Sequence, residues 1–295
     1  MIKKLALFAA LTLSSAALFA NAPFMNLWDG VQMPGFKIGE AEYMKGKIIP
    51  GRKHQSYDYK NVSKPAIQIY ALKSDKPTAA VIVCPGGAYS GLVYGKEGED
   101  IANYLNSIGV SAFILKYRVS EKKDRDAAFN DIQRAIRLVR ANAKKFNIDP
   151  DKIGVMGFSA GGHLSARAST GYNENSYAPL DKIDKVSAKP DFTILIYPAW
   201  LDNRKDYGLA PEFKVDSQTP TAFIVQAQND TGLINSSIAY YLALKGAGVD
   251  ADLHLYSKGG HAYGILQNGL PIDNWHKSLT DWLVFKGFAN KAQGE

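Results

Sequence analysis

A short glycine–serine–glycine motif in the middle of the chain limits the folds that this sequence can adopt. Residues 157–161 read Gly-Phe-Ser-Ala-Gly, directly after an apolar run at 152–156 and directly before a helix-capable segment at 160–168. In a strand–turn–helix setting, this G-x-S-x-G pattern indicates a sharp turn that presents the serine hydroxyl above a sheet. Glycine is needed on both sides of the serine because a side chain there would collide with the neighbouring strand or helix. The alternative interpretation is a glycine-rich turn with an incidental serine, and the strand and helix context disfavours it.

Apolar runs and helical spacings alternate from residue 79 onward. Continuous apolar runs predict strands at 79–84, 110–117, 192–197 and 222–227, and alternating runs predict strands at 66–72 and 251–256. Helical spacing predicts helices at 98–108, 126–146, 235–245 and 275–288. Segment 171–190 is polar and expected at the surface, and segment 198–219 is expected to form a loop or cap over the site. The sequence therefore predicts an α/β fold with a mostly parallel central sheet and helices on both faces.

The first 22 residues have the composition of an export signal. Lys3 and Lys4 precede an apolar stretch at 5–20, and small residues at 20–22 supply a cleavage site. We therefore expect a signal peptide at 1–22 and a single domain at 23–295, exported to a periplasm or secreted from the cell. No later stretch is long and apolar enough to cross a bilayer, so no membrane association is expected after cleavage.

Composition restricts the partners and cofactors to be expected. Of the 295 residues 46% are hydrophobic and 21% charged, which is typical of a globular protein with a sizeable core. The formal charge of +7 is spread over the chain without a dense basic run, so the sequence gives little support for nucleic-acid binding. Cys84 is the single cysteine, which excludes an intrachain disulfide and a cysteine-based metal site. The oligomeric state is left open.

A serine hydroxyl needs a base to remove its proton, and that base needs an orienting acid. His261 is the predicted base because it stands in a glycine-rich loop, 258–264, just past the last predicted strand. Asp230 is the predicted acid because it follows the strand at 222–227 and precedes His261 in the chain. Asp202 also follows a strand end and is the alternative acid. We interpret His163, one turn after Ser159 on the same helix, as a structural histidine.

Backbone N–H groups near the serine could stabilise a negatively charged oxygen. The N–H of Ala160 begins the helix after the serine. The Pro-Gly-Gly-Ala run at 85–88 follows a buried strand, and its glycines allow a close approach to a substrate oxygen. We therefore predict an oxyanion hole made by the N–H groups of Gly87, Ala88 and Ala160.

Several long stretches together resemble a known family. These stretches are VIVCPGGAYSGL, EGEDIANYLNSIGVSAFILKYRV, DIQRAIRLVRANAKKFNIDPDKIGVMGFSAGGHLSA, ILIYP and ALKGAGVDADLHLYSKGGHAYG. They are similar to the secreted α/β-hydrolase esterases of the BD-FAE-like branch, which include acetylxylan esterases. The resemblance implies the α/β-hydrolase fold, no cofactor, and hydrolysis of carboxylic esters such as acetyl groups on plant polysaccharide. It places Ser159, Asp230 and His261 on the triad positions, and Gly87 with Ala160 on the oxyanion positions.

The chain departs from that family's pattern at two places. Ala88 replaces the third glycine of a PGGGY motif, and the acid loop around Asp230 is shortened. Four aromatic residues near the motifs are candidates for stacking on sugar rings, which are Tyr89, Tyr94, Trp200 and Tyr263.

The sequence predicts a serine esterase that removes short acyl groups, such as acetyl, from a carbohydrate, without a bound metal. A general short-chain esterase, a feruloyl esterase and a serine peptidase are alternatives within the same chemistry. A non-catalytic carbohydrate-binding protein is the alternative outside it, and the shortened acid loop is its only support.

Overall fold

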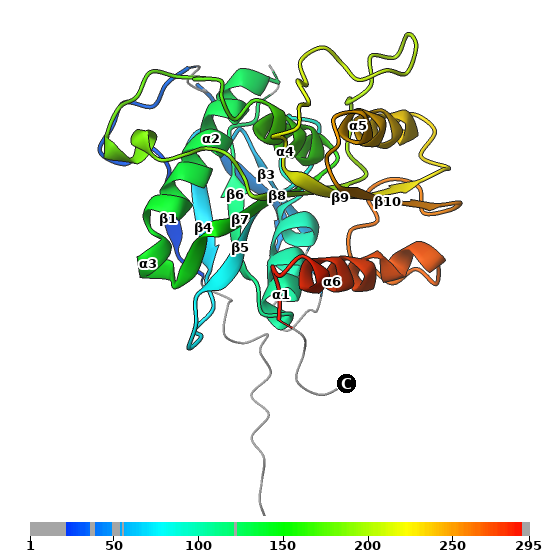
Figure 1. The fold of residues 1–295 in the computed structure, drawn as a ribbon. Helices are drawn as coiled ribbons and strands as arrows, with labels where there is room; N and C mark the ends of the chain where they lie inside the picture. Colours follow the sequence, from blue (N-terminus) through cyan, green and yellow to red (C-terminus); the bar gives the residue numbers. More distant parts are fainter. Residues whose placement is uncertain (1–21, 36–38, 49–53, 55, 121–122, 291–295) are drawn as a thin grey trace, which may run out of the picture.

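An eight-stranded sheet is the centre of the protein (Figure 1). The computed structural model describes residues 22–35, 39–48, 54, 56–120 and 123–290. The strand order in this sheet is β1-β4-β6-β5-β7-β8-β9-β10. Its strands are β1 (Phe24–Asn26), β4 (Ala66–Tyr70), β5 (Thr78–Cys84), β6 (Ser111–Lys116), β7 (Ile148–Phe158), β8 (Phe192–Ile196), β9 (Thr221–Ala227) and β10 (Ala251–Tyr256). Except for Ala22, the predicted signal peptide lies outside the described residues.

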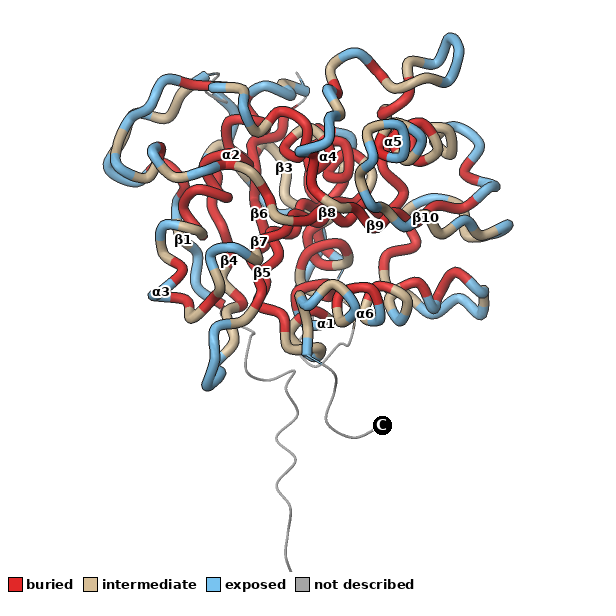
Figure 2. Tube along the Cα trace, in the orientation of Figure 1, coloured by how far each residue is buried: buried red, intermediate tan, exposed pale blue. Residues whose placement is uncertain are grey.

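The sheet is parallel from β6 to β10, as the alternation of strands and helices predicts. In the described sheet, β4 is the one strand whose direction is reversed, because it pairs antiparallel with both β1 and β6. Residues of β5, β6, β8 and β9 are almost all buried, which agrees with their continuous apolar runs. Figure 2 shows this buried core as a band of strands with exposed loops around it.

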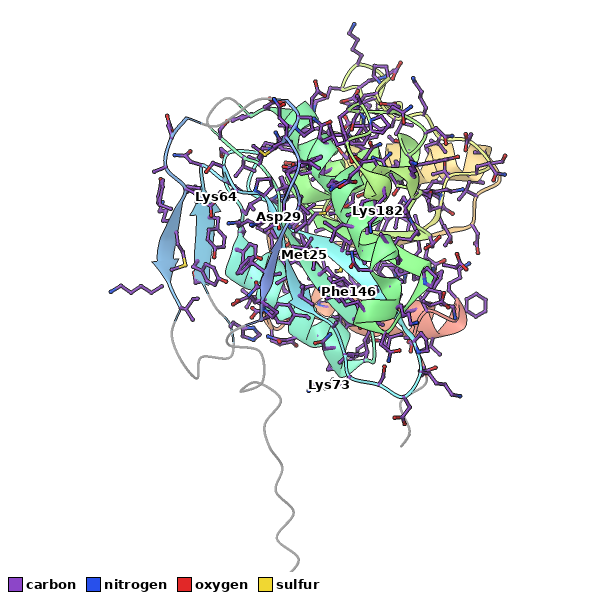
Figure 3. All side chains as sticks on the ribbon, turned by 90° about the vertical axis from the view of Figure 1, so that its left-hand side faces the viewer. Met25, Asp29, Lys64, Lys73, Phe146 and Lys182 are labelled. Atoms are coloured by element: carbon purple, nitrogen blue, oxygen red, sulfur yellow. The ribbon has the colours of Figure 1, made fainter. Side chains whose placement is uncertain are left out.

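Helices cover both faces of the sheet (Figure 1). On one face lie α2 (Arg125–Ala141), α4 (Ala160–Thr170) and α5 (Ile234–Gly246), and on the other lie α1 (Asp100–Ser107) and α6 (Trp275–Phe285). Trp282 of α6 packs its ring against Phe192 of β8 and Phe223 of β9, which fixes this helix under the sheet. A separate two-stranded sheet, β2 (Tyr43–Lys47) and β3 (Ser56–Lys60), stands at one margin of the molecule, with Lys64 just beyond it (Figure 3).

Two predicted helices differ from the structure in their details. The helix predicted at 126–146 is interrupted at Asn142, whose side-chain amide donates to the Leu138 carbonyl, and a short helix α3 (Ala143–Phe146) follows. Asparagine often ends a helix in this way because its side chain competes with the backbone for hydrogen bonds. The helix predicted at 98–108 begins with one π-helical turn, η2 (Gly95–Glu99), before α1.

The segment before the serine turn is longer than predicted. Strand β7 already begins at Ile148, and the pairing with β5 shifts register between Thr78 and Ala80. This irregularity accommodates Pro150, which has no N–H to donate to a neighbouring strand. Two short 3-10 helices complete the described elements, η3 (Lys182–Lys185) and η4 (Pro271–Asn274).

Candidate active site

Ser159 occupies the turn between β7 and α4, as the G-x-S-x-G motif predicts. Its backbone angles are φ 51° and ψ −116°, a conformation that costs a non-glycine residue free energy. A Cβ atom on Gly157 would lie 2.0 Å from the Gly161 carbonyl oxygen, and one on Gly161 would lie 2.0 Å from the Cys84 carbonyl oxygen. Both flanking glycines are therefore required by close backbone contacts, and the serine is held between them.

The carboxyl ends of four strands, β5, β7, β9 and β10, bring the predicted site residues together. Cys84 of β5 pairs with Gly157 of β7, so the loop after β5 and the serine turn start side by side. Ser159, Asp230 and His261 follow β7, β9 and β10 respectively, all at the same edge of the sheet. This edge is the usual ligand-binding edge of a parallel α/β sheet.

The side chains of Ser159, His261 and Asp230 form a hydrogen-bonded chain. The Nε2 atom of His261 lies 2.9 Å from the Ser159 hydroxyl oxygen, and its Nδ1 atom lies 2.7 Å from Oδ2 of Asp230. A carboxylate can only accept a hydrogen bond, so Nδ1 carries the proton and Nε2 is available to accept from the hydroxyl. The arrangement can therefore remove the serine proton and stabilise the resulting imidazolium.

Asp202, the alternative acid, has a different role in the structure. Its buried carboxylate accepts a hydrogen bond from the Ser236 hydroxyl at 2.7 Å, and its backbone forms a bridge with Leu209. Asp230 is the carboxylate behind the imidazole. The neighbouring residue Asn229 accepts hydrogen bonds from the N–H groups of Gly259 and Gly260, which ties the acid loop to the histidine loop.

The loop after β5 packs directly against the serine. A Cβ atom on Gly86 would lie 3.0 Å from the Ser159 Cβ atom, and one on Gly87 would lie 2.2 Å from the Gly91 carbonyl oxygen. Ala88 has φ 53°, so it occupies the left-handed region that a glycine would adopt at lower cost. The N–H groups of Gly87, Ala88 and Ala160 donate to no other residue that the structure describes. They are available to a substrate oxygen.

A buried carboxylate that the sequence did not indicate lies beneath this loop. Glu97 is 1% exposed, and its two oxygens accept hydrogen bonds from the Gly86 N–H at 2.8 Å and the Tyr197 hydroxyl at 2.9 Å. The Tyr197 hydroxyl in turn accepts from the Gly264 N–H at 3.1 Å, in the loop that follows His261. Burial raises the pKa of the Glu97 carboxyl, while these donors act in the opposite direction. In sequence, Glu97 stands among charged residues at 96–100 and looks like an ordinary solvated helix start.

His163 is a structural histidine, in agreement with the sequence analysis. Its Nδ1 atom lies 2.9 Å from the Tyr89 hydroxyl, and its ring is buried against Phe213. Burial lowers the pKa of His163, which favours the neutral ring.

Three of the four predicted sugar-stacking aromatics cannot present a ring face to a substrate. Tyr89, Tyr94 and Tyr263 are 1%, 0% and 5% exposed, so they are core residues and the prediction was wrong for them. Aromatic residues beside a motif cannot be told from core aromatics by sequence, because both have the same local pattern. Trp200 is partly exposed and lines a pocket.

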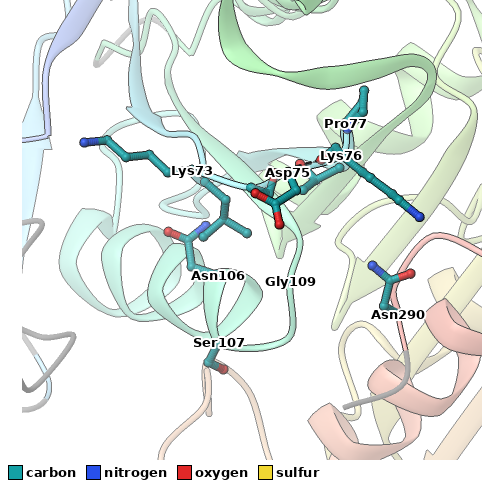
Figure 4. Close-up of a pocket in the computed structure, with 11 residues that line it drawn as sticks. Lys73, Asp75, Lys76, Pro77, Asn106, Ser107, Gly109 and Asn290 are labelled. Carbon is teal, nitrogen blue, oxygen red and sulfur yellow. Dashed lines mark hydrogen bonds between the residues drawn. The ribbon is translucent and has the colours of Figure 1, made fainter. Parts of the chain in front are cut away.

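Two surface pockets of similar size differ in their relation to this site. One of about 620 Å³ lies at the opposite edge of the sheet, between the turn before β5 and the end of α1 (Figure 4). The other, of about 630 Å³, is lined by Arg125, Trp200 and residues of the loop 202–212. The second lies on the same side of the sheet as the serine turn, because Trp200 follows Ala199, whose N–H donates to the Ser159 carbonyl at 3.0 Å.

No group of three or more His, Cys, Asp or Glu side chains in the residues that the structure describes could hold a metal ion. Of the helices formed by the same residues, none has the length and apolar character needed to span a membrane.

Known proteins are similar to this chain in sequence and in architecture. Residues 67–196 match the family model described as BD-FAE. An acetylxylan esterase of Xylanibacter ruminicola is 31% identical over 247 residues, which are 72% of this chain and 48% of that protein. The chain thus spans about half the length of this curated relative.

Two solved structures extend the comparison. The crystal structure of an acetyl ester-xyloside bifunctional hydrolase from Caldicellulosiruptor lactoaceticus has a TM-score of 0.77 and 30% identity, covering 93% of this chain and 100% of the other. MGS-M1, an alpha/beta hydrolase enzyme from a Medee basin deep-sea metagenome library, has a TM-score of 0.61 and 29% identity, covering 75% and 92%. The chain therefore belongs to the BD-FAE family and has the α/β-hydrolase fold.

Proposed function

We propose that this protein is a serine esterase that removes short acyl groups, such as acetyl, from a carbohydrate. The observation that carries the proposal is the chain of two hydrogen bonds, 2.9 Å and 2.7 Å, that links Ser159 through His261 to Asp230. The carbohydrate preference is supported by two relatives, whose names are acetylxylan esterase and acetyl ester-xyloside hydrolase.

The chemistry follows from the positions of these groups. His261 accepts the Ser159 proton as the hydroxyl oxygen attacks the ester carbonyl, and the N–H groups of Gly87, Ala88 and Ala160 hold the oxyanion. The ester C–O bond then breaks, and the leaving alcohol takes the proton from the imidazolium. Water activated by His261 attacks the acyl-enzyme, which releases the carboxylic acid and restores the serine.

Two alternatives to this proposal are an esterase with a lipid-like substrate and a protein without catalytic activity. The pocket beside Trp200 has a rim of charged and amide side chains, which suits a sugar better than the acyl chain of a lipid. This lining favours a carbohydrate ester over a general lipid-like ester. The shortened acid loop, the one argument for a non-catalytic protein, still brings the Asp230 carboxylate to 2.7 Å from the imidazole.

Replacing Ser159 with alanine tests the proposal. We expect Ser159→Ala to lower acetate release from acetylated xylan and from a chromogenic acetate by at least about a thousandfold, since triad serines contribute factors of this order or more. A fluorophosphonate probe should label the wild-type protein and not this variant. Ser107→Ala is the control, because Ser107 is an exposed residue at the end of α1. Retention of wild-type activity by Ser159→Ala would refute the proposal.

We also propose that the protein is exported, on the basis of the basic, apolar and small-residue pattern of residues 1–22. Export agrees with a polysaccharide substrate outside the cytoplasm. Mass spectrometry of the protein isolated from an expressing bacterium should find a chain that begins at Pro23. Recovery of the uncleaved chain from the cytoplasm alone would contradict this expectation.

A further inference from the structure

Two residues that line the pocket beside Trp200 contact loops that carry the candidate active site. Trp200 stacks on Tyr89 with ring centroids 6.3 Å apart, and Tyr89 directly follows Ala88 of the predicted oxyanion hole. On the far side, the Arg204 guanidinium donates to the Gly232 carbonyl at 3.2 Å, two residues past Asp230. These two contacts place the pocket beside the oxyanion loop and the acid loop.

Two guanidinium groups of this pocket, those of Arg125 and Arg204, are exposed and each has a hydrogen-bond partner. The Arg125 guanidinium carbon lies 4.9 Å from the centre of the Trp200 ring, and a terminal nitrogen lies 3.3 Å from Nε2 of His163. The other is Arg204, held by the Gly232 carbonyl. Lys205 adds a third cation to the lining.

Arg125 and Trp200 each occupy a position that is unfavourable for that type of residue. Arg125 is the first residue of α2, where the helix dipole favours anions over cations. Trp200 has φ 57°, a left-handed conformation that is costly for a bulky side chain. Costs of this kind persist where a side chain serves a site, so both residues point to a role in binding.

No nearby carboxylate that the structure describes forms an ion pair with these cations. Asp202 is buried and accepts from Ser236, and the Asp206 carboxylate accepts from the Gly208 N–H and the Asn203 amide. Asp124 caps α2, and Asp126, the next acidic residue of that helix, is exposed. Glu212 lies 3.8 Å from His163 and offsets part of the positive charge. None of Arg125, Arg204 and Lys205 forms an ion pair with a residue that the structure describes.

We propose that this pocket binds a carboxylate-bearing sugar of the substrate, that is, a uronic acid unit next to the acylated sugar. The inference rests on the proposed function, and it adds a preference for acidic polysaccharide. Guanidinium groups recognise carboxylates through paired N–H···O bonds, and the side chains of Arg125 and Arg204 are both exposed to solvent. A volume of about 630 Å³ is within the range of pockets that hold ligands of this size.

The test measures binding, so that it does not depend on catalysis. In the Ser159→Ala background, calorimetry compares two acetylated xylo-oligosaccharides of equal length, one with a glucuronic acid branch and one without. We expect the branched oligosaccharide to bind about fivefold more tightly, a factor that corresponds to one charge-assisted contact near the surface. Raising the salt concentration should reduce this ratio.

Two double variants locate the preference. Arg204→Ala/Lys205→Ala should reduce the ratio of the two dissociation constants to about one. Lys73→Ala/Lys76→Ala removes the same charge from the pocket at the opposite edge of the sheet (Figure 4) and should keep the ratio. Equal binding of both oligosaccharides to the parent protein, or an unchanged ratio in the first double variant, would overturn the inference. If the wild-type protein released no acetate from acetylated xylan, that result would instead contradict the proposed function.

Discussion

Several non-glycine residues around the candidate site adopt backbone conformations that are energetically unfavourable. Ser159, Ala88, Tyr197 and Ala262 all have positive φ angles, between 39° and 60°, and all lie in or next to the serine turn, the oxyanion loop or the histidine loop. Each such residue costs on the order of 1 kcal/mol or more. The surrounding hydrogen bonds have to offset these costs, and Glu97 makes two of those bonds.

Removal of the Glu97 carboxylate should therefore impair the reaction more than binding. Glu97→Ala leaves the Gly86 N–H and the Tyr197 hydroxyl without their acceptor in a buried position. We expect kcat for a chromogenic acetate to fall at least about tenfold with little change in KM, because the oxyanion loop and the histidine loop lose alignment.

The conservative variant separates this positioning role from a general loss of structure. Glu97→Gln keeps one acceptor oxygen for Gly86 and the shape of the side chain, so its loss of kcat should be smaller than that of Glu97→Ala. Equal kcat in wild type and Glu97→Ala would show that the carboxylate does not position the site. Circular dichroism of both variants checks that they are folded.

At the scale of elements, the serine turn joins β7 to α4 so tightly that backbone atoms leave no room for a side chain at Gly157 or Gly161. Gly161 lies against the Cys84 carbonyl of β5, so the turn also fixes the distance between the serine and the oxyanion loop. By contrast, Gly246 at the end of α5 has no atom within 4 Å of a Cβ and no positive φ.

These two glycines should respond in opposite directions to alanine. Gly161→Ala should lower the free energy of unfolding by at least about 2 kcal/mol, because the clash is with backbone that cannot move aside cheaply. Gly246→Ala should raise it by roughly 0.5–1 kcal/mol, since alanine restricts the unfolded chain and is favoured in a helix. Urea denaturation measures both values. A Gly161→Ala protein as stable as wild type would be inconsistent with the turn described above.

For the whole molecule, one buried histidine and two partly buried ones make stability depend on pH. Burial lowers the pKa of His163, His254 and His276 below the ordinary value of 6.5. Around His163, Arg125 and Arg167 act in the same direction and Glu212 opposes them. As the pH falls through 6.5, the unfolded chain therefore binds more protons at these positions than the folded chain does.

The free energy of unfolding should therefore decrease between pH 7 and pH 5.5. His163→Asn, which keeps a side-chain partner near the Tyr89 hydroxyl, should reduce this slope although it lowers stability at pH 7. Urea denaturation at several pH values gives the slopes. An identical slope in the variant would indicate that His163 does not contribute to the pH dependence.

The sequence predicted most of the fold because the local patterns agree with the tertiary arrangement. The strands at 192–197 and 251–256 and the helix at 235–245 were within two residues of the observed bounds, since their apolar periodicity reflects burial in this fold. The predictions failed where a single polar side chain ended a helix and where the burial of an aromatic side chain depended on the tertiary structure. Asn142 breaks a helix that its periodicity would continue, and no pattern indicates that Tyr94 lies in the core and Trp200 at the surface.

The sequence alone determined the serine turn, the order of the site residues and the parallel sheet, because each follows from backbone sterics or from the spacing of apolar residues. The tertiary structure decided which carboxylate supports His261, since Asp202 and Asp230 both follow strand ends and only Asp230 reaches the imidazole. It also decided the role of Glu97, whose two hydrogen bonds join segments about ten and one hundred residues away. Contacts between distant segments depend on how the strands are ordered in space, and the local sequence around each partner carries no record of that order.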